Sequence, residues 1–197
     1  ILKDKLVDWG GRTARMEIAT DITENEREKV ALKNALEAQM VLQECVHHLY
    51  ETKDLEEAVN FVLGKIGSFL LASRAYVFEI RGDRIYNTYE WCAEGVMPEI
   101  ELLQDLDITL IDRWRSSFDR HECVVIEDIE AVKDEKPDEY DLLSVQDITS
   151  LVAAPLEQDG ELVGCFGVDN PPAEKLRNIV PLFHTLRYFL MSTIRRV

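Results

Sequence analysis

The sequence lacks an apolar run long enough to cross a bilayer, and its cysteines are few and far apart. Its most apolar segment, residues 179–191, is interrupted by His184 and Arg187, whereas a spanning helix needs about 20 consecutive apolar residues. We therefore predict no direct membrane contact. The cysteines have the spacing of neither a zinc site nor a small disulfide framework; they are Cys45, Cys92, Cys123 and Cys165. We expect reduced, mostly buried thiols in a cytoplasmic protein.

Basic residues are also scarce, with 22 Lys and Arg against 38 Asp and Glu and a net charge of −16. A nucleic-acid-binding surface needs basic groups to neutralise phosphates, and an anionic lipid surface repels an acidic protein for the same reason. We therefore expect protein or small-molecule partners and no nucleic acid. Hydrophobic residues make up 46% of the 197 residues, which suffices for one packed domain with appendages or for two small domains.

The known sequence signatures of catalysis are missing. We find no phosphate-binding loop, nucleophile elbow, H-E-x-x-H zinc motif or glycine-rich dinucleotide motif. His47 and His48 are adjacent on a predicted helix and so point in different directions. His121 and His184 have no cluster of acids and cysteines at ligand spacing. We predict that the chain is not an enzyme and holds no metal, and the sequence names no cofactor.

The N-terminal residues lack an initiator Met and a signal-peptide pattern, and we expect the sequence to begin inside a longer protein. Gly10 and Gly11 predict a turn, and residues 13–19 predict a strand that ends in a turn by residue 23. Because a single strand leaves its hydrogen-bonding edges unpaired, we expect the rest of its sheet to lie outside this sequence.

Residues 25–50 contain neither Gly nor Pro and predict a long helix, which Asp21 or Thr23 would cap. Residues at alternating three–four spacing form a coiled-coil seam along it; they are Leu32, Ala35, Gln39, Leu42, Val46 and Leu49. The last helix repeats this spacing, interrupted at Arg187, with Leu176, Val180, Phe183, Leu190, Ile194 and Val197. The first seam is shorter than four heptads, which is short for a coiled coil that must hold two chains together alone. We therefore predict a homodimer through both helices. The alternative is that each helix packs on its own domain.

Two β-hairpins follow from alternating apolar residues around turn dipeptides. The first joins residues 74–80 and 84–92 through Gly82 and Asp83, and the second joins residues 150–156 and 162–169 through Asp159 and Gly160. A helix with a wide apolar face precedes the first hairpin, running from an Asp54 cap to about residue 72.

The segment between the hairpins is less regular. It predicts short helices at 110–118 and 140–145 and a strand at 123–126. We predict that the acidic stretch 127–141 is a surface loop, because its charge and Pro137 disfavour burial. After the second hairpin, Asn170 is predicted to cap the final helix with Pro171 at its first position. Hairpins flanked by helices indicate the α+β class, with an antiparallel sheet and helices on one face.

Two segments resemble strands of GAF domains, which are small-molecule-sensing modules. Residues 89–96 (YEWCAEGV) resemble the second strand and its loop, and residues 163–171 (VGCFGVDNP) resemble the last strand. This resemblance spans about residues 52–197 and implies a GAF core at 52–172 with a signalling helix at 173–197. Residues 16–24 (MEIATDITE) resemble the end of a PAS domain, which implies a PAS remnant at 1–23 and a linker or coiled-coil helix at 24–51.

PAS–GAF tandems are typical of bacterial diguanylate cyclases with GGDEF domains, of EAL phosphodiesterases and of sensor histidine kinases. The resemblance therefore implies a non-catalytic sensory module that binds a small ligand or mediates dimerisation and relays a signal to an output domain. We expect a diguanylate cyclase or phosphodiesterase output, with a histidine kinase as the alternative. An interaction-only dimerisation module is a further alternative.

The resemblance also implies a ligand pocket between the sheet and the irregular middle segment. Aromatic and aliphatic residues would wall it and acids would anchor a ligand; these residues are Trp91, Trp114, Phe118, Ile126, Glu90, Asp128 and Asp147. Acidic anchors would suit a cationic or amine ligand. The alternative is that the aromatics are core and the acids are solvated. Motifs of cyclic-nucleotide-binding and bilin-binding GAF domains are absent, so neither ligand is favoured.

A GAF-fold enzyme is a separate alternative. Free methionine-(R)-sulfoxide reductases of this family use a nucleophilic cysteine with resolving cysteines, and Cys92, Cys123 and Cys165 are the candidates here. Because these cysteines fall within predicted strands and the flanking helices suit a relay, we favour the sensor. Gly164 and Gly167 are predicted to permit close packing on their strand.

Overall fold

The computed structural model describes residues 2–19, 21–176 and 179–195. The chain divides into two compact units, Ile1–Gln39 and Met40–Val197, which are described separately. Among the described residues, no helix combines the length and the apolarity that crossing a membrane requires.

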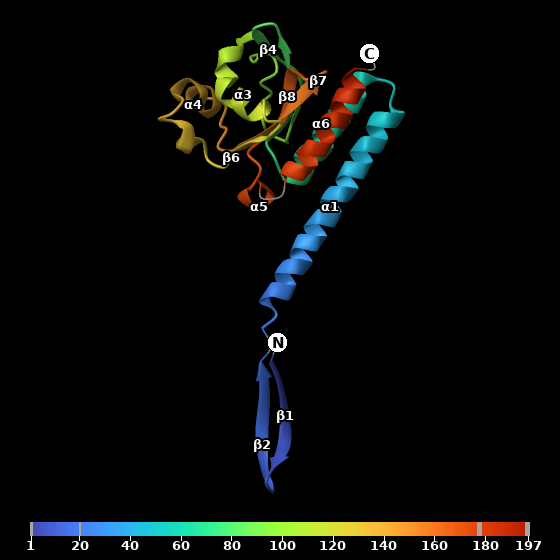
Figure 1. The fold of residues 1–197 in the computed structure, drawn as a ribbon, viewed down its shortest axis with the longest axis vertical. Helices are drawn as coiled ribbons and strands as arrows, with labels where there is room; N and C mark the ends of the chain where they lie inside the picture. The colour runs from blue at the N-terminus through green and yellow to red at the C-terminus, as the bar shows by residue number, and fades with distance from the viewer. Residues whose placement is uncertain (1, 20, 177–178, 196–197) are drawn as a thin grey trace. The chain divides into compact units, whose positions relative to one another are not determined.

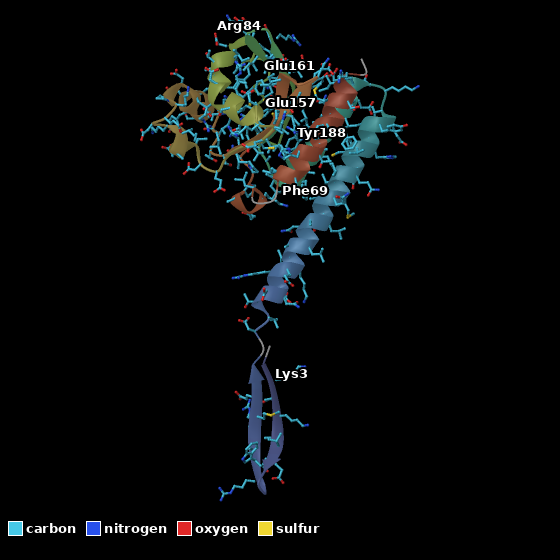
Figure 2. The ribbon with its side chains drawn as sticks, viewed as in Figure 1. Lys3, Phe69, Arg84, Glu157, Glu161 and Tyr188 are labelled. Carbon is cyan, nitrogen blue, oxygen red and sulfur yellow. The ribbon has the colours of Figure 1, made fainter. Side chains whose placement is uncertain are left out.

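The first unit begins with an antiparallel hairpin of β1 (Leu2–Trp9) and β2 (Arg12–Ala19). Gly10 and Gly11 both have positive φ and form the turn, and the Gly11 amide donates to Asp8 Oδ1 at 2.8 Å. The predicted strand at 13–19 is confirmed. The expectation that all of its pairing partners lie outside this sequence is wrong, because β1 pairs with it along its full length. Side chains of the hairpin stand out on both faces (Figure 2).

Helix α1 (Thr23–Glu51) confirms the predicted long helix, and the Thr23 amide donates to Asp21 Oδ1 at its start. Its last turns belong to the second unit, where three side chains are buried in the core: Val41, Cys45 and Leu49. Helix α2 (Leu55–Leu70) follows, and Asp54 caps it as predicted, with Oδ1 accepting from the Glu57 amide at 2.9 Å.

A six-stranded antiparallel sheet with the order β5-β4-β3-β8-β7-β6 forms the centre of the second unit (Figure 1). Both predicted hairpins are present, as β3 (Arg74–Arg81) with β4 (Arg84–Cys92) and β7 (Leu151–Gln158) with β8 (Glu161–Asp169). β3 pairs with β8, which joins the two hairpins. The short edge strands are β5 (Leu106–Asp107) and β6 (Val124–Ile126). The α+β class is confirmed.

The two faces of the sheet carry separate hydrophobic clusters. The longer helices gather on one face, where Phe166 of β8 stacks on Phe183 of α6 (Val180–Ile194) at 4.4 Å between ring centroids. The other face is covered by η1 (Ile108–Ile111), α3 (Asp112–Phe118), η2 (Ile129–Val132) and α4 (Pro137–Ser144). Because side chains alternate along a strand, the neighbouring residues Cys165 and Phe166 of β8 belong to different clusters.

The acidic stretch 127–141 is more ordered and more buried than the sequence predicts. Ile129 and Val132 of η2 are buried, and Glu139 of α4 is only 4% exposed. Pro137 begins α4 instead of preventing it, because the first turn of a helix needs no amide from that position. The surface-loop prediction is therefore wrong for this part of the chain.

The prediction that Asn170 caps one continuous final helix is also wrong. Asn170 has φ of 56°, and its Oδ1 accepts from the Thr149 and Ser150 amides while its Nδ2 donates to the Asp147 carbonyl. This network ties the end of β8 to the segment before β7. Two helices follow, α5 (Ala173–Leu176) and α6. The predicted seam residue Val197 lies outside the described residues.

Candidate ligand-binding site

A cavity of about 70 Å³ lies between the sheet and the short helices of the middle segment. Strands β3, β4 and β8 form its floor, and η1, α3 and α4 cover it. Its apolar walls come from both layers; they are Phe78, Ile80, Ile85, Leu103, Leu106, Leu110, Ile111, Trp114, Leu142, Leu143, Ile148 and Cys165. Its polar lining consists of Arg74, Tyr76, Glu90, Glu139, Gln146 and Asp169.

Strand register brings the polar residues together. Arg74 of β3 is paired with Asp169 of β8, and Tyr76 is paired with Gly167 on one side and with Glu90 of β4 on the other. Gly167 is required for this arrangement, because a Cβ there would lie 2.7 Å from the Tyr76 hydroxyl. At Gly164 a Cβ would lie 2.2 Å from the Phe78 carbonyl oxygen. The predicted close-packing role of both glycines is confirmed.

Arg74 fastens the cover of the cavity to the sheet. It is 5% exposed, and its guanidinium donates to the Met97 carbonyl at 3.2 and 3.1 Å and to the Gln146 carbonyl at 3.1 Å. Its Nη2 also lies 3.7 Å from Glu99 Oε1. Three of the five N–H groups of this cation therefore bind carbonyls of the loop after β4 and of the segment that follows α4.

Asp169 is the polar residue of the described lining that has an acceptor atom free of hydrogen bonds. It is 2% exposed, and its Oδ1 is buried without a hydrogen-bond partner among the described residues. Burial raises the pKa of Asp169 to about 7, against the lowering effects of the Arg74 charge and of a hydrogen bond with Tyr76. Burial and the nearby Asp169 charge in turn raise the pKa of Tyr76 well above its ordinary value.

The other two acids of the lining are saturated. Glu90 Oε2 accepts from the Glu99 and Ile100 amides at 2.8 and 3.1 Å, and its Oε1 accepts from Asn87. Glu139 accepts two hydrogen bonds from Arg113, at 2.6 and 3.0 Å, and one from Trp114 Nε1 at 2.7 Å.

Two of the seven predicted ligand residues, Glu90 and Trp114, line the cavity. Trp91 does not, because it faces α2, where its ring lies over Gly64 and Gly67. Phe118 and Ile126 are buried in the same cluster as Trp114 but are not part of the lining. Asp128 and Asp147 are exposed at the surface. The structure therefore does not support a ligand contact for these five.

Sequence reasoning missed Arg74, Tyr76 and Asp169. Strand alternation offered a usable signal, since positions 74, 76, 78 and 80 share one face of β3. The same rule shows that adjacent residues such as Glu90 and Trp91 do not both face one cavity.

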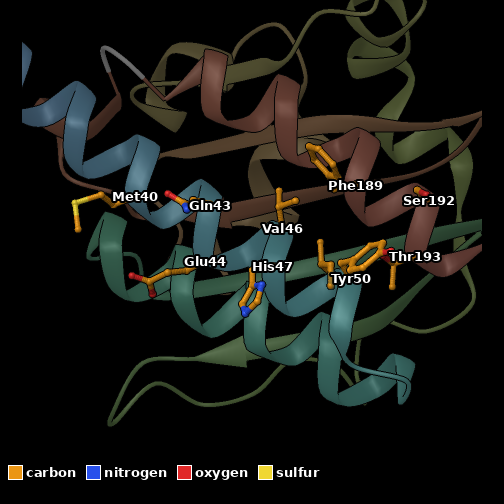
Figure 3. A pocket seen from close by; sticks show the side chains of 10 residues that line it. Met40, Gln43, Glu44, Val46, His47, Tyr50, Phe189, Ser192 and Thr193 are labelled. Atoms are coloured by element: carbon orange, nitrogen blue, oxygen red, sulfur yellow. The ribbon is translucent and has the colours of Figure 1, made fainter.

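A groove of about 740 Å³ lies between the last turns of α1 and α6 (Figure 3). Met40, Val46 and Tyr50 line it from α1, and Phe189 lines it from α6. The predicted seam is exposed at Leu32, Ala35 and Gln39 and half-buried at Leu42, Val46, Val180 and Ile194. Leu49, Phe183 and Leu190 are at most 2% exposed in the core of the chain itself. The prediction that these three face a second chain is wrong.

The thiols are not activated. Burial raises the pKa of Cys45 and Cys165 to about 12 and that of Cys92 and Cys123 to about 11. Over the described residues, no group of three or more His, Cys, Asp and Glu side chains is arranged to hold a metal ion.

No protein-family model and no curated protein matches the chain. The phycocyanobilin-bound GAF domain of a cyanobacterial phytochrome matches with a TM-score of 0.64 and 16% identity, over 81% of this chain and 94% of that chain. The GAF domain of Acinetobacter phosphoenolpyruvate-protein phosphotransferase matches with a TM-score of 0.59 and 13% identity, over 80% of this chain and 92% of that chain. The chromophore-binding domain of Stigmatella aurantiaca bacteriophytochrome matches with a TM-score of 0.67 and 14% identity, over 100% of this chain and 70% of that chain. The fold is GAF-like.

Proposed function

We propose that this chain is a non-catalytic sensory segment whose GAF-like domain binds a small molecule in the cavity and relays its presence to an output domain. The observation that carries the proposal is the cavity itself. It lies between the sheet and its cover, is largely apolar, and has buried ionisable groups together at one end, as small-molecule sites commonly do.

The size of the cavity limits the ligand. Sites for drug-sized molecules have volumes of roughly 300–1,000 Å³, whereas this one has about 70 Å³. A bilin such as the one held by the phytochrome neighbour would require the cover to move away from the sheet. We therefore favour a compound of a few heavy atoms over a chromophore.

The connections of the polar residues provide a route for the signal. Arg74 binds carbonyls of two cover segments, and Asp169 ends β8 next to Asn170, whose side chain holds the segments around Asp147 and Ser150. The chain then continues into α5 and α6. A ligand that engages Asp169 would act on the strand end from which the C-terminal helix departs, which gives the small displacement that signalling helices transmit.

We also propose that the module is a homodimer through α1 and α6. Support comes from the exposed apolar residues along α1, with Leu32 72% and Met40 54% exposed, and from the groove beside Phe189. The three–four spacing of the α1 seam favours a second copy of the same helix as the occupant.

The hairpin β1–β2 fits the proposal that a PAS domain precedes α1. A two-stranded hairpin is marginally stable alone in water, and Leu6, Trp9 and Met16 are 69%, 78% and 43% exposed. These features are those of a sheet that continues into a preceding domain. A diguanylate cyclase or phosphodiesterase is the output domain that we propose, with a histidine kinase as the alternative.

The reductase alternative is disfavoured by the chemistry of the thiols. A nucleophilic cysteine acts as the thiolate, which a lowered pKa supplies. Here burial raises the pKa of Cys92, Cys123 and Cys165 to about 11 or 12. An interaction-only dimer remains the main rival to the ligand sensor.

The test is to purify the protein under native conditions, denature it and identify any released compound by mass spectrometry, with light scattering on the same sample. A dimer that releases an equimolar compound supports the sensor. A dimer that is empty, and whose cavity residues respond to no small molecule, supports the interaction-only module.

A further inference from the structure

We propose that the cavity takes a small aliphatic amine, whose ammonium group lies against Asp169 and whose hydrocarbon body lies against the apolar walls. This inference rests on the proposed function, since it names the ligand class of the same cavity. It goes further than the proposed function, because it names a ligand class from the hydrogen bonding of the polar residues in the lining.

At the polar end of the cavity, one acceptor atom of the described lining, Asp169 Oδ1, is left without a hydrogen-bond donor. Arg74 donates to the Met97 and Gln146 carbonyls, and Glu90 accepts from two backbone amides and from Asn87. The Gln146 amide donates to the Leu142 carbonyl at 2.7 Å. Asp169 Oδ1 alone is both buried and without a partner in this described lining. A buried polar atom of this kind is costly unless a ligand or water completes it.

The charges at this end favour a cation over an anion. Arg74 contributes one positive charge, and the acids beside it are Glu90, Glu99 and Asp169 when ionised. The Glu139 carboxylate is neutralised by Arg113. An ammonium group would offset the surplus negative charge and would donate to Oδ1, whereas a carboxylate ligand would add to the repulsion. Three N–H groups of Arg74 already donate to carbonyls of the cover.

The rest of the cavity determines the body of the ligand. Aliphatic side chains from strands and cover make up most of the remaining lining, including Ile80, Ile85, Leu110 and Leu143. Such walls stabilise a hydrocarbon group and penalise further polar atoms that find no partner. The small volume restricts this group to a few carbons.

Binding should depend on pH. Asp169 is faced by Arg74, Tyr76 and Glu90, with Cys165 nearby on β8. Since the pKa of Asp169 is about 7, the carboxylate that the ammonium needs is mostly protonated at about pH 6 and mostly ionised at about pH 8. We expect affinity for an amine to be about tenfold higher at the higher pH.

The experiment is a methyl NMR titration of the whole chain with three probes of one shape, isobutylamine, isobutanol and isobutyrate, at about pH 6 and about pH 8. We expect saturable shifts of the Ile80, Ile85 and Leu143 methyl groups, with isobutylamine binding about tenfold tighter than isobutanol at the higher pH. The Asp169→Asn variant should lose this preference while keeping isobutanol affinity. Asp147→Asn, an exposed acid that is not in the lining, is the matched control and should bind as the unmodified chain does.

A second variant keeps the test decisive if Asp169→Asn does not fold. Tyr76→Phe removes a hydrogen bond that lowers the pKa of Asp169, so the pH midpoint for isobutylamine binding should move upward. Equal or tighter binding of isobutanol or isobutyrate in the cavity would overturn the amine assignment and leave the sensor proposal intact. If no probe shifts these methyl groups and the natively purified chain carries no compound, both proposals fail.

Discussion

Arg74 and Asp169 are paired across β3 and β8, yet the guanidinium donates to the carbonyls of Met97 and Gln146, and Asp169 Oδ1 is left without a partner. A buried acid beside a buried cation would ordinarily complete its hydrogen bonds with it. Here Arg74 holds the cover of the cavity, and Asp169 Oδ1 stays available to accept a hydrogen bond from a ligand. This division of roles between two neighbours is the basis for the ligand proposals.

Asp169 should make stability depend on pH in a defined direction. Its pKa is 3.8 in an ordinary setting and about 7 in the fold, so the folded state binds more protons between these values. The free energy of unfolding should therefore fall as pH rises from about 4 to about 7. The Asp169→Asn variant lacks this titration, so its stability relative to the unmodified chain should rise over that window and level off above it.

Urea unfolding at several pH values measures this difference, with Asp147→Asn as the control that should show no such trend. A stability difference for Asp169→Asn that is constant across the window would mean that the folded carboxyl titrates at its ordinary value.

The ring of Trp91 should make Gly67 intolerant of a side chain. A Cβ at Gly67 would lie 2.2 Å from Trp91 Cζ3, whereas a Cβ at Gly64, one turn earlier on α2, would meet the ring at 3.2 Å. We expect Gly67→Ala to cost about 1–3 kcal/mol. Gly64→Ala should be close to neutral, because the gain in helix propensity of about 1 kcal/mol offsets a small adjustment of the ring.

A double variant tests whether the Trp91 ring is the cause. In a Trp91→Leu background, Gly67→Ala should lose most of its cost, and chemical denaturation of the four variants gives the coupling. Additive effects would show that the ring does not lie over Gly67.

Glu139 should contribute more to stability than the charge of its segment suggests. It is 4% exposed and accepts from both Arg113 and Trp114. We expect Glu139→Ala to cost about 2 kcal/mol, below the value for fully buried pairs because Arg113 is partly exposed. The matched control is Glu130→Ala in the same acidic stretch, where the carboxylate is exposed and the loss should be smaller. Equal losses in thermal unfolding would contradict this placement.

The dimer proposal depends on exposed apolar residues of two helices. Leu32→Asp on α1 and Phe189→Asp on α6 should each convert a dimer into monomers, because each places a charge in the proposed interface. Val145→Asp carries the same change at a residue that is 78% exposed on the cavity-cover side and should stay dimeric. Sedimentation velocity distinguishes the species. A monomeric unmodified chain, or a dimer in both helix variants, would refute the interface.

Local patterns were sufficient to predict most elements of the fold. Asp54 marked the start of α2, and Asp159 with Gly160 marked the second hairpin, because capping and turn formation depend on a few adjacent residues. The role of Asn170 was not predictable in this way. Its side chain is engaged by the segments around Asp147 and Thr149, which are distant in the sequence, instead of capping a helix.

The site was harder to predict than the fold because its polar residues come together only through strand register. Asp169 sits at the end of an apolar strand, and Arg74 opens another, so neither shows its partner in the sequence. Glu139 lies within a run of charges that predicts solvent exposure, and its burial depends on Arg113 and Trp114, some 25 residues earlier. Glu90 and Trp114 were found because they lie near recognisable strand and helix segments.

The most direct test of the central claim is the amount of small molecule that the natively purified chain releases, compared with a chain whose cavity is filled. Cys165→Leu enlarges a buried side chain in the cavity lining, and Cys123→Leu makes the same change outside it. The account predicts an equimolar compound from the unmodified chain and from Cys123→Leu, and none from folded Cys165→Leu. Equal release from all three, or an empty chain whose cavity residues respond to no probe, would contradict it.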